Sequence, residues 1–204
     1  GAALAADKAE VAFRRTSGAS KALARTMTDS YAATREMGVT MEQAGQTISS
    51  LHSRFTDFTM ITKRAATEIQ NTGNLMQRLG VSSDSYATAL QIGNKVLGQT
   101  AEQAASTTLE LTSLAANIGV APAQMINDFG AARDSVAKLG ADGVRAFKDL
   151  ARVSKITGLE VTKLLAITDK FDTFEGAATQ AGKLNAALGG NFVNAMDLMT
   201  ATDP

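Results

Sequence analysis

The sequence predicts an all-α fold: a long, coiled-coil-like helix followed by helical hairpins of about 39 residues. Apolar residues recur at helical spacing along almost the whole chain, and no stretch shows the two-residue alternation of a β-strand. One stretch carries a heptad seam. Glycines placed to end helices recur at intervals of 42, 39 and 39 residues.

Composition fits closely packed, thin helices. The 204 residues are 45% hydrophobic but only 5% aromatic, so small side chains fill the core. The 20 basic and 20 acidic residues balance, so no specific nucleic-acid binding and no membrane-surface binding is expected. The absence of cysteine excludes disulfides, thiolate nucleophiles and cysteine metal sites.

The first expected domain, residues 1–38, is an alanine-rich helix with a narrow stripe of Leu23, Met27 and Tyr31. Six basic residues face three acidic ones over residues 1–35. This excess could contact a polyanion, but solvated helix faces commonly have the same composition. Because its apolar surface is small, the helix is expected to need a partner chain to stay folded.

The second expected domain, residues 39–79, is the heptad helix. Apolar or small residues follow one another in steps of three and four, with Thr62 and Thr72 at the weaker positions. The predicted oligomer seam consists of Ile48, Leu51, Phe55, Phe58, Ala65, Ile69, Met76 and Leu79. The pattern calls for a partner helix, and it leaves open whether that helix belongs to another copy or to the same chain.

The third expected domain, residues 80–204, is the hairpin region. The glycines expected to stop helices are Gly38, Gly80, Gly119, Gly158, Gly189 and Gly190. Helix starts agree with them: Thr40 with Gln43 and Thr100 with Gln103 form capping boxes, Ser82 or Ser83 can cap another helix, and Pro122 suits a first helical position. The shared interval predicts either a true repeat or helices of similar length.

Residues 176–184, GAATQAGKL, have the look of a phosphate-binding loop. However, five residues separate Gly176 from Gly182 where four are needed, and Leu184 occupies the position of the magnesium-binding Ser or Thr. No strand precedes the stretch. A capped helix that ends at Gly189 explains the same residues, so neither a nucleotide cofactor nor an enzyme is predicted.

His52 is the only histidine, and Asp57 lies one position away from a helical metal-ligand spacing. An exposed histidine beside the seam is therefore favoured over a metal ligand. The longest run without charge, residues 111–127, has 17 residues and contains Gly119 and Pro122, so no membrane span is expected. Since the chain begins without methionine and ends within a helical pattern, it is expected to be a piece of a longer protein.

Residues 170–204, KFDTFEGAATQAGKLNAALGGNFVNAMDLMTATDP, resemble a stretch of bacteriophage tail tape-measure proteins. Residues 51–90 are similar to that family too, and the segments containing IGVAPAQM and TGLEVTKL share its character. The resemblance covers roughly residues 40–204.

The resemblance implies a mostly helical structural virion protein that sets tail length during assembly. It implies a location in the tail tube or baseplate hub, assembly in the host cytoplasm, and contacts with tail-tube and baseplate hub proteins. It also implies association with further copies, expected as a trimer, and carries over no catalytic residue. The alternative that the residues leave open is a cellular all-helical interaction or adaptor module.

Overall fold

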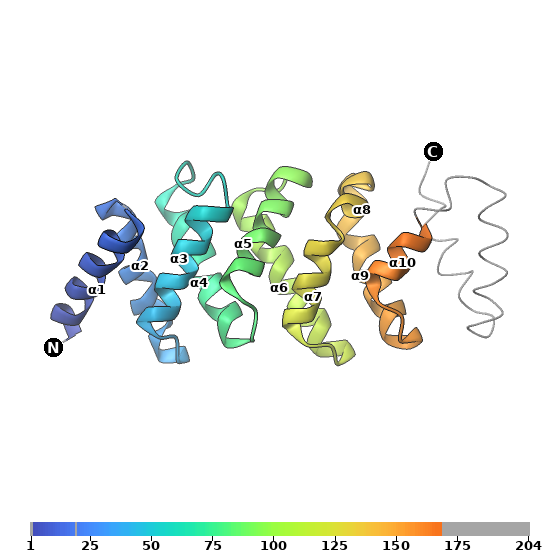
Figure 1. The fold of residues 1–204 in the computed structure, drawn as a ribbon, viewed down its shortest axis with the longest axis horizontal. Helices are drawn as coiled ribbons and strands as arrows, with labels where there is room; N and C mark the ends of the chain where they lie inside the picture. The colour runs from blue at the N-terminus through green and yellow to red at the C-terminus, as the bar shows by residue number, and fades with distance from the viewer. Residues whose placement is uncertain (1, 19, 169–204) are drawn as a thin grey trace. The chain divides into compact units, whose positions relative to one another are not determined.

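The computed structural model describes residues 2–18 and 20–168. Within them the chain forms ten α-helices and no β-strand, so the predicted all-α class is confirmed there (Figure 1). None of these helices is both long and apolar enough to cross a bilayer. The described residues divide into two compact units, the first ending at residue 130 and the second beginning at residue 131.

The first unit contains six complete α-helices and most of a seventh. A 3-10 turn, Arg35–Met37, follows the second helix, and a π-helical turn, Ile92–Val96, follows the fifth. The helices are α1 (Ala2–Ser17), α2 (Lys21–Thr34), α3 (Met41–Arg54), α4 (Lys63–Arg78), α5 (Ser83–Gln91), α6 (Ala101–Ile118) and α7 (Pro122–Ala131).

Helices of the first unit pack on their sequence neighbours and on the helix after that. Consecutive helices α3 and α4 are in contact, as are α5 and α6. In addition α2 packs on α4, α4 on α6, and α3 on α5 (Figure 1). The even-numbered helices therefore form one layer and α3 with α5 forms a second, and the core lies between them.

The described part of the second unit contains α8 (Arg133–Lys138), a 3-10 turn (Gly140–Asp142), α9 (Gly143–Thr157) and α10 (Val161–Thr168). Helix α9 packs on both α8 and α10. The core of the described part of the second unit is apolar, and it contains Val136, Phe147, Leu150 and Leu164, each about 1% exposed.

The single long helix predicted over residues 39–79 is wrong. Helix α3 ends at Arg54, and Phe55 takes an extended backbone conformation. The break lets Phe55 and Phe58 enter the core, where they are 1% and 3% exposed. Thr62, assigned to the seam by the sequence, instead caps α4 by accepting a hydrogen bond from the Ala65 N–H. The heptad spacing in the sequence therefore runs through the connection between α3 and α4 and does not mark one continuous helix.

The single helix predicted over residues 1–38 is also two helices. Gly18 has a φ of 65°, a conformation that other residues resist, and it separates α1 from α2. Ser20 then caps α2 by accepting a hydrogen bond from the Leu23 N–H. Helix α2 packs on α3 and α4 of the same chain, and of its apolar stripe Met27 is buried while Leu23 and Tyr31 are half-buried.

Local signals for helix starts are confirmed. Both capping boxes are complete, with the Thr40 N–H donating to Gln43 and the Thr100 N–H to Gln103. Ser82, rather than Ser83, caps α5, and α7 begins at Pro122.

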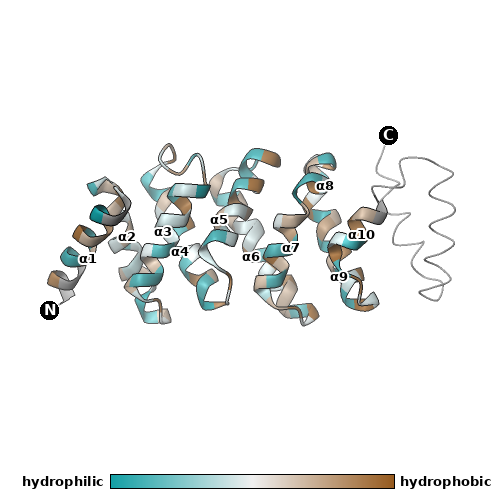
Figure 2. Cartoon of the chain, viewed as in Figure 1, coloured by the Kyte–Doolittle hydropathy of each residue, from teal (hydrophilic) through white to brown (hydrophobic). Residues whose placement is uncertain are grey.

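The buried interior of the first unit contains many polar side chains. Figure 2 shows hydrophilic and hydrophobic residues interspersed along its helices. The buried polar residues are Thr26, Ser30, Thr34, Thr47, Ser50, Gln70, Thr72, Asn74, Thr107, Thr108 and Thr112. Hydroxyls such as that of Thr34, which donates to the Ser30 carbonyl, satisfy themselves within their own helix.

Among the described residues, Tyr86 on α5 is the largest fully buried side chain, and its hydroxyl donates to the Ile69 carbonyl of α4 at 2.7 Å. Burial raises the pKa of the Tyr86 phenol well above its usual value near 10. The folded chain therefore keeps a proton that the unfolded chain releases as the pH rises above about 10.

We expect the stability of the first unit to fall above about pH 10, by up to about 1.4 kcal/mol per pH unit. The Tyr86→Phe variant should be less stable than the wild type by about 1 kcal/mol at pH 7, because it loses a buried hydrogen bond. It should also lose stability less steeply with pH. Urea unfolding followed by circular dichroism at pH 7 to 11 measures both effects, and equal pH slopes for the two proteins would contradict the assignment.

Candidate functional site

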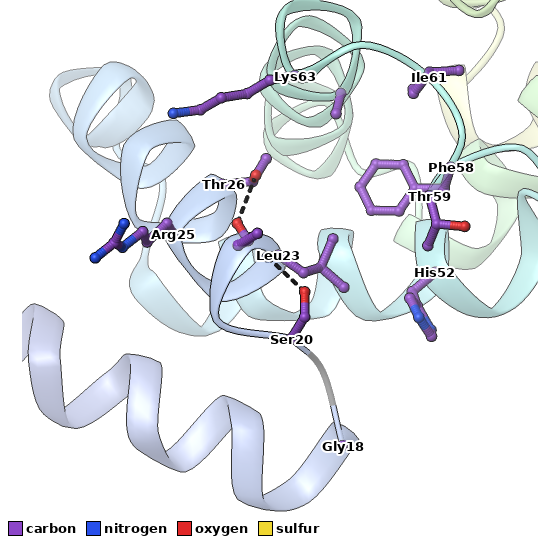
Figure 3. A pocket seen from close by; sticks show the side chains of 12 residues that line it. Gly18, Ser20, Leu23, Arg25, Thr26, His52, Phe58, Thr59, Ile61 and Lys63 are labelled. Carbon is purple, nitrogen blue, oxygen red and sulfur yellow. Dashed lines mark hydrogen bonds between the residues drawn. The ribbon is translucent and has the colours of Figure 1, made fainter.

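A hollow of about 480 Å³ opens on the first unit where several chain segments meet. It lies among the start of α2, the end of α3, the connection at residues 55–62 and the start of α4. We call it the basic hollow, because its lining includes Arg25, His52 and Lys63 but no carboxylate. In Figure 3 the charged ends of Arg25 and Lys63 lie on one side of it and His52 on another.

The local structure explains this arrangement. The Ser20 and Thr62 caps fix the starts of α2 and α4, which carry Lys21 and Lys63 as their first residues. The floor is apolar: Leu23 and Phe58 point toward one another in Figure 3, and Phe58 is anchored in the core. Lys63 makes an exposed ion pair with Asp29 at 3.5 Å.

A second hollow, of about 400 Å³, adjoins the first at Gly18, which lines both. Its other lining residues are Val11, Arg14 and Arg15 at the end of α1. Together the two hollows gather cations from α1, α2 and α4. The chemistry available to them is the binding of negative charge by guanidinium and ammonium groups.

His52 is exposed at the rim of the basic hollow, as the sequence favoured. In the part of the chain that the structure describes, no group of three or more His, Asp or Glu side chains is close enough to hold a metal ion. The phosphate-loop look-alike at residues 176–184 lies outside the described residues.

Polar side chains also join α2 to α4 in the interior. The Ser30 hydroxyl donates to Asn71 Oδ1 at 2.6 Å, and Asn74 Nδ2 donates to the hydroxyls of Ser30 and Thr34 at 3.0 and 3.2 Å. This network was not predicted from the sequence. The signal was present as a helical repeat of hydroxyls at Thr26, Ser30 and Thr34.

Gln70, one turn before Asn74, is fully buried, and neither atom of its side-chain amide has a hydrogen-bond partner. A buried amide without partners costs free energy, because it has lost the hydrogen bonds that water gives the unfolded chain. Gln70 is therefore a weak point at the centre of the first unit.

A third polar cluster ties α3 to the start of α5. The Ser50 hydroxyl donates to Asp84 Oδ1 at 2.7 Å, and Arg54 Nη2 donates to Asp84 Oδ2 at 2.9 Å. These contacts, that of Ser50 first, lower the pKa of the Asp84 carboxyl below its usual 3.8. The stability they add is present above that usual pKa and is lost as the pH falls through the lowered value.

We expect the Ser50→Ala variant to raise the pKa of Asp84 toward its usual value, because the largest stabilising contact of the charged form is removed. An NMR titration of the Asp84 side-chain carboxyl carbon measures this shift. Ser53→Ala is the matched control, since the Ser53 hydroxyl donates to the Ser50 carbonyl and leaves Asp84 untouched. An unchanged Asp84 pKa in Ser50→Ala would show that Arg54 alone sets it.

The predicted oligomer seam lies inside the first unit. Ile48, Leu51, Phe55, Phe58, Ala65, Ile69 and Met76 are each at most 3% exposed in the single chain, whereas Leu79 is 50% exposed. A coiled coil with another copy along this seam would have to separate helices that already cover it.

The predicted helix stops take left-handed conformations. Gly38, Gly80, Gly119 and Gly158 have φ values of 83°, 86°, 71° and 72°. Gly98 and Gly140 do the same at the second break of their intervals. Gly189 and Gly190 lie outside the described residues.

No protein-family model, curated protein or solved structure matches this chain.

Proposed function

We propose that this chain is a folded structural segment of a bacteriophage tail tape-measure protein, a virion component without catalytic activity. The resemblance of residues 170–204 and 51–90 suggests the family. The observation that carries the structural role is the packing of consecutive helices between glycine stops: α3 on α4 between Gly38 and Gly80, and α5 on α6 between Gly80 and Gly119. This supports helical hairpins of about 39 residues as the building unit.

Folding into hairpins shortens the distance that this segment could span along a phage tail. A continuous helix of 39 residues would extend about 58 Å at about 1.5 Å per residue. A packed helical pair advances by only about 10 Å, the distance between neighbouring helix axes. We therefore propose that this segment is a folded part at the tube end or baseplate hub, and that an extended region of the parent chain measures the tail.

In this proposal the predicted oligomer seam does not join copies of the chain, because all its residues except Leu79 are buried within the single chain. We expect the isolated 204-residue chain to be monomeric in sedimentation-velocity experiments. A trimer would restore the coiled-coil hypothesis.

The function itself is tested in the virion. Mass spectrometry of purified tails should detect peptides of this chain, and their absence would reject the proposal. In-frame deletion of residues 81–119 from the parent gene should leave tail length, measured by electron microscopy, changed by no more than about 10 Å. A shortening near 58 Å would instead indicate that the interval is extended in the tail.

A second candidate is a cellular helical interaction module. It is favoured by one observation, the open basic hollow on a unit that buries its own apolar residues. Detection in purified tails separates the two, because an adaptor module would be absent from the virion.

A further inference from the structure

We infer that the first unit carries a sequence-independent binding surface for the phosphate backbone of double-stranded nucleic acid. The surface consists of the basic hollow and the adjoining hollow at the end of α1. This inference goes beyond the proposed function and does not depend on it, because it uses only the charges and shape of the described residues.

Positive charge is concentrated around the two hollows. Residues 11–28 contain four basic side chains, Arg14, Arg15, Lys21 and Arg25, and no acidic one. Three of these line the two hollows, where Lys63 joins them from α4. A concave surface that carries only positive charges over an apolar floor focuses the electric field and attracts anions.

Most of these charges lack an ion-pair partner. Neither Arg14, Arg15 nor Arg25 makes an ion pair with any residue that the structure describes, and the only pair of Lys63 is the exposed one with Asp29. Lys21 and Lys63 also stand first in α2 and α4, where the helix dipole favours acidic residues. The folded chain thus holds positive charges close to one another, and bound phosphates would reduce the repulsion between them.

A nucleic-acid duplex fits this surface better than a single strand or a lipid surface does. Single strands usually bind across several exposed aromatic rings on which successive bases stack, whereas the basic hollow has one exposed ring, that of His52, because Phe58 is 3% exposed. The cations are exposed around the two hollows, and a convex ridge of phosphates can enter a hollow that a flat lipid surface would only span. Contact by cations alone gives affinity without base specificity. It is therefore compatible with the expectation of no specific nucleic-acid binding.

The test measures binding of a fluorescein-labelled 20-base-pair duplex to the whole chain by anisotropy between 50 and 200 mM NaCl. We expect a Kd of about 10⁻⁵ M at the lowest salt, and a slope of log K against log[NaCl] near −3 for three to four phosphates contacted. The R14Q/R15Q/R25Q variant should bind at least about tenfold more weakly and lose most of that slope.

The matched control is R145Q/R152Q/K163Q in the second unit. It also removes three positive charges, each of which is exposed and pairs with a neighbouring acid: Asp142, Asp149 or Glu160. It should bind within about twofold of the wild type if the hollows, rather than net charge, are responsible. Equal losses in both variants, or no duplex binding at 50 mM NaCl, would overturn the inference.

A second measurement locates the duplex without removing any charge. The chain has no cysteine, so Thr59→Cys places a single photo-crosslinker in the basic hollow, and Thr162→Cys places one on an exposed position of α10. Crosslinking from residue 59 but not from residue 162 is expected. Crosslinking from residue 162 alone, or tighter binding to vesicles containing phosphatidylserine or to polyglutamate than to the duplex, would reject a nucleic-acid surface.

Discussion

Replacing Gly73 with alanine is expected to destabilise the first unit by about 1–3 kcal/mol. Gly73 lies in the interior of α4, and a Cβ added there would come within 2.6 Å of Thr47 Cγ2 and 2.7 Å of Tyr86 Cε1. Both neighbours are fully buried, so neither can move aside into solvent. The methyl group would therefore force α3 or α5 away from α4.

Gly45→Ala is the control for this substitution. Gly45 is also helical, and the added Cβ would meet only Met27 Sδ at 3.7 Å, an ordinary contact. Alanine should therefore stabilise α3 by up to about 1 kcal/mol through its higher helix propensity. Urea unfolding of both variants gives the two free energies of unfolding. A stabilising Gly73→Ala would mean that the α3–α4–α5 interface is looser than the structure shows.

Replacing Gln70 with leucine is expected to stabilise the first unit by about 1–3 kcal/mol. The two side chains are similar in size, and leucine removes an amide whose two polar atoms have no partner. The change in free energy of unfolding can be measured by urea denaturation. A loss of stability would reveal that Gln70 has a hydrogen-bond partner such as a buried water molecule.

Gln77→Leu on the same helix should act in the opposite direction. Gln77 Nε2 donates to the Gln43 carbonyl at 2.7 Å and to the Thr47 hydroxyl at 2.8 Å. The same substitution there removes two hydrogen bonds between α3 and α4 and should cost about 1–2 kcal/mol. Opposite signs for the two glutamines would show that hydrogen-bond partners, rather than residue type, determine the effect.

Local signals in this sequence predicted local structure well. Thr40 with Gln43 needs only a few neighbouring residues to form a capping box, and Gly119 needs only its own backbone to take a positive φ. These features depend on chain geometry within one turn, so the sequence specifies them without knowledge of the fold.

Contacts between distant segments were not predictable in the same way. The steps of three and four continued through Phe55 and Phe58, because a chain that reverses can bury residues at the same spacing as a straight helix. Thr62 could be read as a weak seam position or as a helix cap, and only the packing of α3 on α4 decides between them. The basic hollow likewise joins Arg25 of α2 with Lys63 of α4, a pairing that requires the tertiary fold.

The polar network between α2 and α4 also bears on mispairing between copies. An array of helices of similar length and composition risks pairing a helix with the wrong neighbour or exchanging it with another molecule. Rotating α2 about its axis, or sliding it by less than a full turn, would move Ser30 and Thr34 away from Asn71 and Asn74, leaving the buried Asn74 amide without these partners. These few polar side chains thus limit α2 to alignments that place a hydroxyl opposite Asn74, in an interface whose alanines and threonines would tolerate others.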